Sequence, residues 1–376
     1  MHPFLASIRR TIEKYGLIRP GERILVGVSG GPDSVSLLHG LRQYYGDQSD
    51  IRAIHIHHGL RGREADGDEA WVRELCESMG IACVVRRIEP ERWAEGTNQS
   101  VQMRARQMRY EHFRSAIREH DADRLALGHT ADDQAETVLL NLLRGSGRPG
   151  LAGIPPCRPA GAGGATIIRP LIEMTREEVL AFLRDERMAY REDSSNQSDK
   201  YLRNRIRRHL LPLLAAYNPG IRDHLIRTAE ILREEEDWME GETAQALDTV
   251  KTESAEGEAG ISIPRLLELP LAHRRRVVHR MLRDLAGEEA TFEHVESLLS
   301  HLVQWSGEKR FTLPGGALAI RERDTLSFLR AEPPATPDAE MKLEVPGSTE
   351  LAPWGIRLET SVLSKEGCDP LPSSSL

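Results

Sequence analysis

A glycine-rich turn near the N-terminus carries the clearest chemical signal of the 376-residue sequence. The turn reads Ser29-Gly30-Gly31-Pro32-Asp33-Ser34 and joins an apolar run, residues 24–28, to a segment with helical periodicity. Backbone N–H groups at such a turn bind phosphate, and glycine lets the backbone approach the anion closely. Two hydroxyl groups add donors, and the Asp33 carboxylate in the first helical turn suits Mg²⁺ held against phosphate oxygens. The turn therefore predicts a nucleotide phosphate site.

This turn matches neither of two common phosphate-binding motifs. It has no Gly-Lys-Ser/Thr, so it is not a Walker A loop, and no G-x-G-x-x-G, so it is not a dinucleotide fingerprint. The structural alternative is an ordinary glycine-rich turn with a good helix cap. The strand, the helix, Asp33 and Ser34 together argue against that alternative.

A second group of reactive side chains follows a later apolar run, residues 124–128. It contains His129, Asp132, Asp133 and Glu136. The carboxylates are three and four residues apart, so they share one face of a helix. Beside a phosphate site they suit Mg²⁺, held by Asp33, Asp132 and Glu136, or a cationic amine such as the ammonium of lysine. The alternative is that acidic residues simply cap the helix.

Histidines and arginines extend the predicted site. His58 follows a strand pattern at residues 51–57, where we expect it to contact adenine or ribose; the spacing of His55, His57 and His58 does not suit zinc. Arg106 and Arg109 share a helix face and could meet a triphosphate or RNA phosphates. A basic segment of five cations within nine residues predicts an RNA backbone contact: Lys200, Arg203, Arg205, Arg207 and Arg208. A solvated helix balanced by the acidic run at residues 234–237 is the alternative.

Alternating periodicities predict the elements that position these residues. Strand patterns cover residues 23–28, 51–57, 81–88 and 124–128, and helical patterns cover 34–45, 64–79, 99–119 and 132–144. Such alternation predicts a parallel sheet covered on both faces, with its ligand at the carboxyl ends of the strands. Residues 145–164 form a Gly/Pro-rich stretch with no helical period, which we expect to be a functional loop or a mobile flap. Thr175 and Glu178 predict a capping box.

The second half of the chain has a different pattern. Helical periodicity runs from about residue 201 to 283, short strands follow at 310–329, and a proline-rich linker at 332–337 precedes a strand-like stretch, 341–363. We expect domains at 1–215, at 216–330 (helical, with a terminal β-hairpin) and at 331–376. The last is a linker and an incomplete, truncated-looking segment, although a naturally short terminus is the alternative.

Composition excludes several classes of protein. Hydrophobic residues make up 39% and charged residues 29% of the chain, and the net charge is −8. No run of 18 apolar residues occurs, so we expect no transmembrane helix and no membrane partner. The four cysteines never form C-x-x-C, which disfavours disulfide frameworks and metal-binding ribbons and points to the cytoplasm.

The motifs together resemble those of the tRNA(Ile)-lysidine synthase family within the PP-loop ATP-pyrophosphatases. Besides SGGPDS at residues 29–34, the resemblance rests on segments across residues 20 to about 210: 55–61 (HIHHGLR), 105–110 (ARQMRY), 128–137 (GHTADDQAET), 141–145 (NLLRG), 150–156 (GLAGIPP), 169–171 (RPL), 193–196 (DSSN) and 201–207 (YLRNRIR). It implies an α/β fold: a Rossmann-like PP-loop ATPase domain, a mainly helical domain at 216–330 that binds tRNA, and a short β-rich C-terminal segment.

The resemblance also implies a reaction. ATP would adenylate the C2 oxygen of the wobble cytidine in the CAU anticodon of tRNA(Ile), and L-lysine would displace AMP to leave lysidine. Ser29 to Ser34 and His58 would bind ATP; Asp33, Asp132, Asp133, Glu136 and Arg106 would bind Mg²⁺ or lysine or act in catalysis. A homodimer is an open alternative. The competing functions are a PP-loop tRNA thiolase, which usually needs C-x-x-C cysteines, and a non-catalytic ATP- or RNA-binding module.

Overall fold

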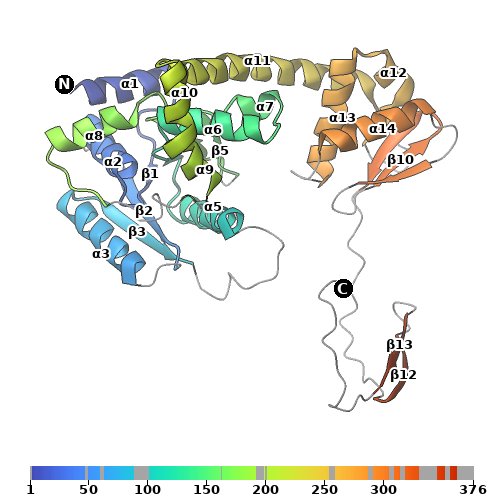
Figure 1. Cartoon of the computed structure of the whole chain (residues 1–376), viewed down its shortest axis with the longest axis horizontal. Helices are drawn as coiled ribbons and strands as arrows, with labels where there is room; N and C mark the ends of the chain where they lie inside the picture. The colour runs from blue at the N-terminus through green and yellow to red at the C-terminus, as the bar shows by residue number, and fades with distance from the viewer. Residues whose placement is uncertain are drawn as a thin grey trace. The chain divides into compact units, whose positions relative to one another are not determined.

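A six-stranded sheet organises the first half of the chain (Figure 1). The computed structural model describes residues 2–46, 50–59, 63–88, 101–161, 163–191, 199, 201–253, 259–286, 291–304, 309–313, 318–329, 345–351 and 356–361. Two compact units divide the chain, Met1–Met239 and Glu240–Leu376. The boundary falls within one long helix, α11 (Ile221–Val250).

The sheet is parallel apart from one edge strand, which confirms the expected architecture. Its order is β3-β2-β1-β4-β6-β5. These strands are β1 (Ile24–Gly27), β2 (Ile51–His57), β3 (Ala82–Arg87), β4 (Arg124–Ala126), β5 (Cys157–Pro159) and β6 (Thr166–Ile168). Only β5 is antiparallel to its neighbour, β6. Because β2 and β4 lie on opposite sides of β1, the strand order reverses at β1, and ligands bind beyond the carboxyl ends of strands at such a switch point.

Helices cover both faces of this sheet because its strands are apolar on both. One face packs against helices α1 (Pro3–Tyr15), α2 (Pro32–Tyr45), α3 (Arg63–Ser78) and α8 (Arg176–Asp185), while α5 (Val101–Glu119) covers the other. Ile24 and Val26 belong to the first core and Leu25 to the second. Side chains alternate between the faces of a strand, so consecutive apolar residues in β1 supply both cores.

A small helical layer carries the acidic and basic residues singled out in the sequence. It consists of α6 (Ala131–Leu143), α9 (Leu202–Arg205), a π-helical turn η3 (Ile206–Leu210) and α10 (Leu211–Tyr217). Ile206 and Leu211 pack against Ala135 and Leu139 of α6 in a separate apolar cluster. This packing brings the basic segment against the face of α6 that carries the carboxylates.

The Gly/Pro-rich stretch at 145–164 is more ordered than its composition predicts. It contains a one-turn helix, α7 (Arg148–Leu151), and strand β5, and of its residues only 162 lies outside the described part. Side chains of α6 hold it: the Asn141 amide donates to the Gly150 carbonyl at 2.7 Å, and the Gln134 amide binds both backbone groups of Ile154. The expectation of a stretch without helical structure was wrong, because these stabilising contacts come from another element.

The second unit has its own core and a five-stranded antiparallel sheet in the order β7-β8-β11-β10-β9. It comprises β7 (Lys251–Glu253), β8 (Ala259–Ser262), α12 (Ile263–Glu268), α13 (Leu271–Ala286), α14 (Phe292–Gln304), β9 (Lys309–Thr312), β10 (Leu318–Glu322) and β11 (Thr325–Leu329). The predicted strands at 310–329 are confirmed, whereas β7 and β8 lie where helical periodicity was expected. Further along, β12 (Gly347–Leu351) pairs with β13 (Ile356–Thr360) in a two-stranded sheet.

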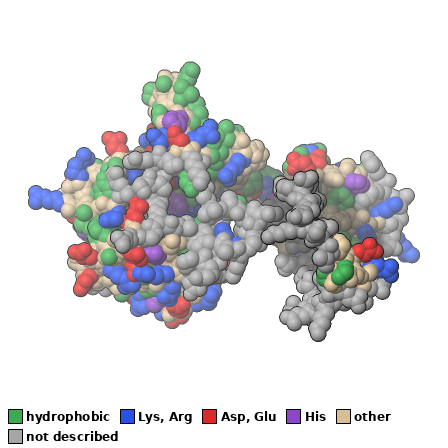
Figure 2. All heavy atoms as spheres, turned by 60° about the horizontal axis from the view of Figure 1, so that its bottom comes forward, with side chains coloured by type: hydrophobic (Ala, Val, Ile, Leu, Met, Phe, Trp, Pro, Cys, Tyr) green, Lys and Arg blue, Asp and Glu red, His purple; other side chains and the backbone are tan. Residues whose placement is uncertain are grey.

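The charged side chains are of mixed sign. Figure 2 shows Lys and Arg side chains interspersed with Asp and Glu on the face that it draws. None of the described helices is both long enough and apolar enough to cross a membrane.

Candidate active site

The predicted phosphate loop connects β1 to α2 and is held by its own hydroxyl groups. The Ser34 hydroxyl donates to the Gly31 carbonyl at 2.9 Å and accepts from the Ser29 N–H at 3.2 Å. Gly30 has a φ of +93°, a left-handed conformation that favours glycine. Gly31 caps α2 without a side-chain hydrogen bond, and Pro32 opens the helix. The first turn of α2 is thus preorganised and uncapped, as an anion-binding helix N-terminus requires.

The loop forms one wall of a cavity of about 200 Å³ at the carboxyl ends of the central strands. The other walls come from β2, α5 and the end of β4. The lining residues are Gly27, Val28, Ser29, Gly31, Asp33, Ser34, Ile54, Ile56, His58, Arg109, Phe113, Leu127, Gly128 and His129. Five sequence-predicted ATP residues are among them: Ser29, Gly31, Asp33, Ser34 and His58.

Close contact between two turns builds this cavity. A Cβ atom at Gly128 would lie 2.8 Å from the backbone oxygen of Asp33. Only glycine therefore lets the end of β4 pack against the start of α2.

Asp33 is a half-buried carboxylate with one satisfied oxygen. Its Oδ2 accepts from the Arg176 guanidinium at 3.1 Å, whereas its buried Oδ1 has no hydrogen-bond partner among the described residues. Burial raises the pKa of Asp33 to about 6; the Arg176 charge opposes this shift and the Asp133 charge adds to it. An unsatisfied carboxylate oxygen beside a phosphate loop is a ready ligand for a cation.

The acidic residues of α6 are already paired with arginines. Glu136 is 1% exposed and accepts from Arg203 Nε at 2.9 Å and from Arg207 Nε at 2.5 Å. Oδ1 of Asp133 accepts from the same two side chains at 2.9 and 3.5 Å. The structure thus unites two groups that the sequence analysis treated separately, the acidic cluster and the basic segment.

The other carboxylate oxygens of this cluster also have specific partners. Oδ2 of Asp133 accepts from the Thr130 N–H at 2.9 Å in a capping box. Asp132 accepts from the Arg176 N–H at 2.7 Å and pairs with Arg222 at 3.1 Å. Burial by itself would raise the pKa of Asp133, but the Arg203 guanidinium holds that pKa below its usual value. No group of three or more His, Cys, Asp or Glu side chains in the described part of the chain is arranged to hold a metal ion.

Arginine and histidine side chains lie on the α5 side of the cavity. Nδ1 of His129 lies 3.2 Å from Arg169 Nε, and Arg169 also donates to the Pro155 carbonyl at 2.6 Å. Burial lowers the pKa of His129 well below its usual value, so this imidazole is neutral. Arg109 lines the cavity, and its buried Nε has no hydrogen-bond partner among the described residues.

The remaining predicted residues have varied surroundings. Nδ1 of His55 donates to the Val28 carbonyl at 2.8 Å, and His57 pairs with Asp66 at 3.2 Å, so of the three clustered histidines only His58 lines the cavity. Arg205 and Arg208 are exposed, and Arg208 pairs with Asp199 at 2.8 Å. Lys200 lies outside the described residues.

Sequence reasoning missed Arg176 and Arg222 as site residues. Arg176 directly follows the predicted N-cap Thr175, and Arg222 opens α11. Neither position carries a local signal, because their carboxylate partners are distant in the sequence.

Comparison with known proteins decides the family. Residues 3–214 match the family model of the PP-loop domain, and residues 261–327 match the TilS substrate binding domain. The tRNA(Ile)-lysidine synthase of Solibacter usitatus is 38% identical over 361 residues, covering 94% of this chain and 77% of that protein. The Bacillus subtilis tRNA(Ile)-lysidine synthase is 34% identical over 327 residues, covering 86% and 69%. The chain belongs to the tRNA(Ile)-lysidine synthase family.

Membership of the lysidine synthase family confirms the resemblance carried by the sequence motifs. The PP-loop match contains both the phosphate loop and the acidic cluster, and a PP-loop domain implies ATP binding. Among solved structures, the U34-tRNA thiolase NcsA from Methanococcus maripaludis has a TM-score of 0.52 at 24% identity, covering 61% of this chain and 78% of that chain. That likeness supports the PP-loop fold alone.

Proposed function

We propose that this chain ligates L-lysine to C2 of the wobble cytidine in the CAU anticodon of tRNA(Ile), forming lysidine and changing codon specificity from AUG to AUA. In the first step the C2 oxygen attacks the α-phosphate of ATP, and pyrophosphate leaves. In the second step an amine of lysine attacks C2, the C2–O bond breaks, AMP leaves with the oxygen, and the amine gives up a proton. Adenylation is needed because the C2 oxygen is otherwise a poor leaving group.

The phosphate loop and its neighbours would bind ATP. The N–H groups at the start of α2 and the hydroxyl of Ser29 face the cavity wall where a triphosphate would lie, and Gly30 and Pro32 set the loop conformation. The imidazole of His58, which lines the same cavity, would contact the adenosine. Arg109 on α5 lines the cavity and would supply positive charge to the phosphates.

Asp33 fits Mg²⁺ better than the three-carboxylate set expected from the sequence. Its Oδ1 is unsatisfied, whereas Asp132 and Glu136 already bind guanidinium and backbone N–H groups. Mg²⁺ is usually held by one or two carboxylates together with phosphates and water. When bound at Asp33, the ion would offset negative charge on the phosphate oxygens.

The strongest support for a lysine substrate is that Asp133 and Glu136 already bind two organic cations. The guanidinium groups of Arg203 and Arg207 lie where a substrate ammonium would find two buried carboxylates next to the phosphate loop. A site for a cation favours a ligase that takes an amino acid over a thiolase. None of the cysteines in the described part of the chain lines the cavity, which also disfavours the thiolase.

Contact with tRNA is proposed for the basic segment and for the second unit. The exposed Arg205 would contact RNA phosphates, while Arg203, Arg207 and Arg208 would need to exchange their carboxylate partners for phosphates. The match of residues 261–327 to a substrate binding domain supports a role of the second unit in holding tRNA. The homodimer remains a prediction that sedimentation velocity at several concentrations would test.

Incorporation of radiolabelled lysine into a tRNA(Ile) transcript with a CAU anticodon tests the proposal. We expect label to enter the RNA only with ATP, and not when the wobble cytidine is replaced by uridine. ATP–pyrophosphate exchange that needs tRNA but not lysine would support adenylation as the first step. Incorporation of sulfur in place of lysine would overturn the ligase, and the absence of both activities would leave a binding module.

A further inference from the structure

Four arginines surround one buried tyrosine on the side of α5 that faces the sheet edge. The guanidinium carbons of Arg106, Arg109 and Arg158 lie 5.1, 5.8 and 5.0 Å from the centre of the Tyr110 ring. Arg169 lies close enough for its charge, like those of Arg106 and Arg158, to lower the pKa of Tyr110 against the raising effect of burial. Within the described part of the chain, none of these four arginines forms an ion pair with a carboxylate.

Such a concentration of like charge is costly unless an anion joins it. Burial lowers the pKa of Arg169 to about 10, and the neighbouring Arg158 and Arg106 charges contribute to that shift. Burial likewise lowers the pKa of Arg109, whose Nε has no hydrogen-bond partner among the described residues. Buried cations are normally paired, so this cluster is incomplete without a negatively charged ligand.

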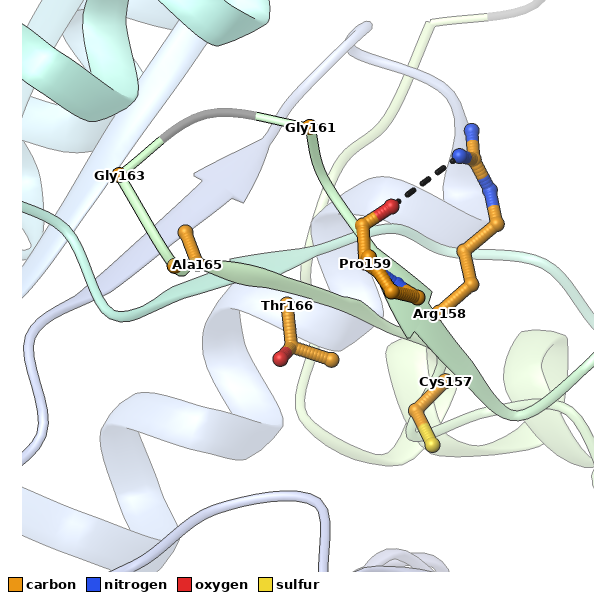
Figure 3. A pocket seen from close by; sticks show the side chains of 8 residues that line it. Cys157, Arg158, Pro159, Gly161, Gly163, Ala165 and Thr166 are labelled. Atoms are coloured by element: carbon orange, nitrogen blue, oxygen red, sulfur yellow. Dashed lines mark hydrogen bonds between the residues drawn. The ribbon is translucent and has the colours of Figure 1, made fainter. Parts of the chain in front are cut away.

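The cluster has an inner and an outer part. Arg109 lines the ATP cavity, and Arg169 contacts His129 in the same wall. Arg106 is exposed, and Arg158 extends from β5 beside a second, open hollow of about 560 Å³ (Figure 3). The hollow is lined by Arg158 and by glycines 161, 163 and 164 among others, and it shares no lining residue with the ATP cavity. In Figure 3 the Arg158 guanidinium points away from Cys157, with one donor 3.3 Å from the Pro159 carbonyl.

We propose that Arg158 and Arg106 bind a backbone phosphodiester of the RNA substrate, next to the nucleotide whose base enters the ATP cavity. This inference rests on the proposed function. The planar guanidinium groups match phosphate geometry, and the glycine-rich turn beside Arg158 leaves room for a chain as wide as RNA. The outer position favours RNA over pyrophosphate, which would be released at the phosphate loop in the other cavity, with which the hollow beside Arg158 shares no lining residue.

Arg158→Gln and Arg158→Lys test the proposal. Arg118→Gln is the control, because Arg118 is an exposed arginine at the C-terminal end of α5, the helix that also carries Arg106. Binding of an anticodon stem-loop RNA and of the whole tRNA transcript is measured by fluorescence anisotropy over a range of salt concentrations. We expect Arg158→Gln to weaken both by about tenfold, because a charged hydrogen bond is lost. The slope of log affinity against log salt should become shallower by about 0.7, the value for one phosphate of a single strand. Arg158→Lys should retain most of the slope, and Arg118→Gln should match the wild type.

Two further measurements distinguish RNA binding by Arg158 from binding of ATP or pyrophosphate. The KM for ATP and the inhibition by added pyrophosphate should be unchanged in Arg158→Gln, and thermal melting should show that each variant is folded. Unaltered RNA affinity and salt slope would overturn the proposal, and a changed KM for ATP or weaker pyrophosphate inhibition alone would assign Arg158 to the nucleotide. RNA binding is read without turnover, so failure of the wild type to incorporate lysine would count against the proposed function and not against this site.

Discussion

The Nε of Arg203 lies 2.9 Å from Oε2 of Glu136, a carboxylate 67 residues earlier in the chain. Arg207 binds the other oxygen of the same carboxylate. A fully buried glutamate is thus paired with two arginines that sequence reasoning assigned to RNA. This pairing stabilises the site and also occupies the carboxylates proposed to bind lysine.

Removing both arginines should therefore destabilise the first unit. Arg203→Ala combined with Arg207→Ala leaves Glu136 buried without a cation, and we expect a loss of about 3 kcal/mol in the free energy of unfolding. Urea denaturation at pH 7 measures this, with Arg205→Ala as the control because that exposed side chain has no carboxylate partner among the described residues. A double variant as stable as Arg205→Ala would contradict the role of the pair.

The same substitutions test contact with tRNA. Each arginine that binds a phosphate should lower the salt slope of tRNA binding by about 1 when it is replaced, with a smaller effect on ATP affinity. Measurements on folded single variants keep this separate from the loss of stability. If the salt slope of tRNA binding is unchanged in both single variants, these arginines bind only the carboxylates of the acidic cluster and not tRNA.

Asp33→Asn should reduce lysidine formation by about 100-fold or more, the scale of losing one preorganised electrostatic contact. The fold should be retained, because Oδ1 of Asp33 has no hydrogen bond to lose and the amide oxygen of asparagine can still accept from Arg176 in place of Oδ2. Ser34→Ala should differ, since the Ser34 hydroxyl holds the loop together and its loss should affect stability as well as turnover. Labelled-lysine incorporation and thermal melting distinguish the two variants, and wild-type turnover in Asp33→Asn would refute the assignment.

The raised pKa of Asp33 predicts a pH dependence with a definite sign. The folded state holds this proton up to about pH 6, whereas the unfolded chain releases it near 3.8. The folded state therefore binds more protons between these values, and this group's contribution to stability is lost as pH rises from about 4 to 6. Asp33→Asn mimics the protonated form. The melting temperature of this variant, minus that of the wild type, should therefore increase as pH rises through this window. A difference in melting temperature that stays the same from about pH 4 to 6 would show that the pKa of Asp33 is not raised.

Gly128→Ala should damage the ATP site by forcing two backbones apart. The added Cβ would lie 2.8 Å from the Asp33 oxygen, and backbone cannot move aside as cheaply as a side chain. We expect about 1–3 kcal/mol of destabilisation and a higher KM for ATP. Gly241→Ala is the matched control: it lies within α11 with open space around its Cβ position, and it should be neutral or stabilising.

Sequence patterns between neighbouring residues predict most of the secondary structure of the first unit. The strand at 51–57 coincides with β2, and the Thr175–Glu178 capping box forms as expected, because alternation and capping depend on neighbours a few residues away. The phosphate loop could likewise be predicted from six consecutive residues. The stretch at 145–164 could not, since its helix and strand are held by Asn141 and Gln134 and not by its own pattern.

Local sequence patterns were enough to predict the PP-loop architecture, the phosphate loop and the presence of an acidic and a basic group. The packing of the folded chain shows in addition that these two groups neutralise each other, while the arginines around Tyr110 have no carboxylate partner among the described residues. Charge type is a property of each residue, but ion pairing depends on which helices pack together. Here the packing of Ile206 and Leu211 on α6 places Arg203 and Arg207 beside Asp133 and Glu136, and no local pattern in the sequence encodes that contact.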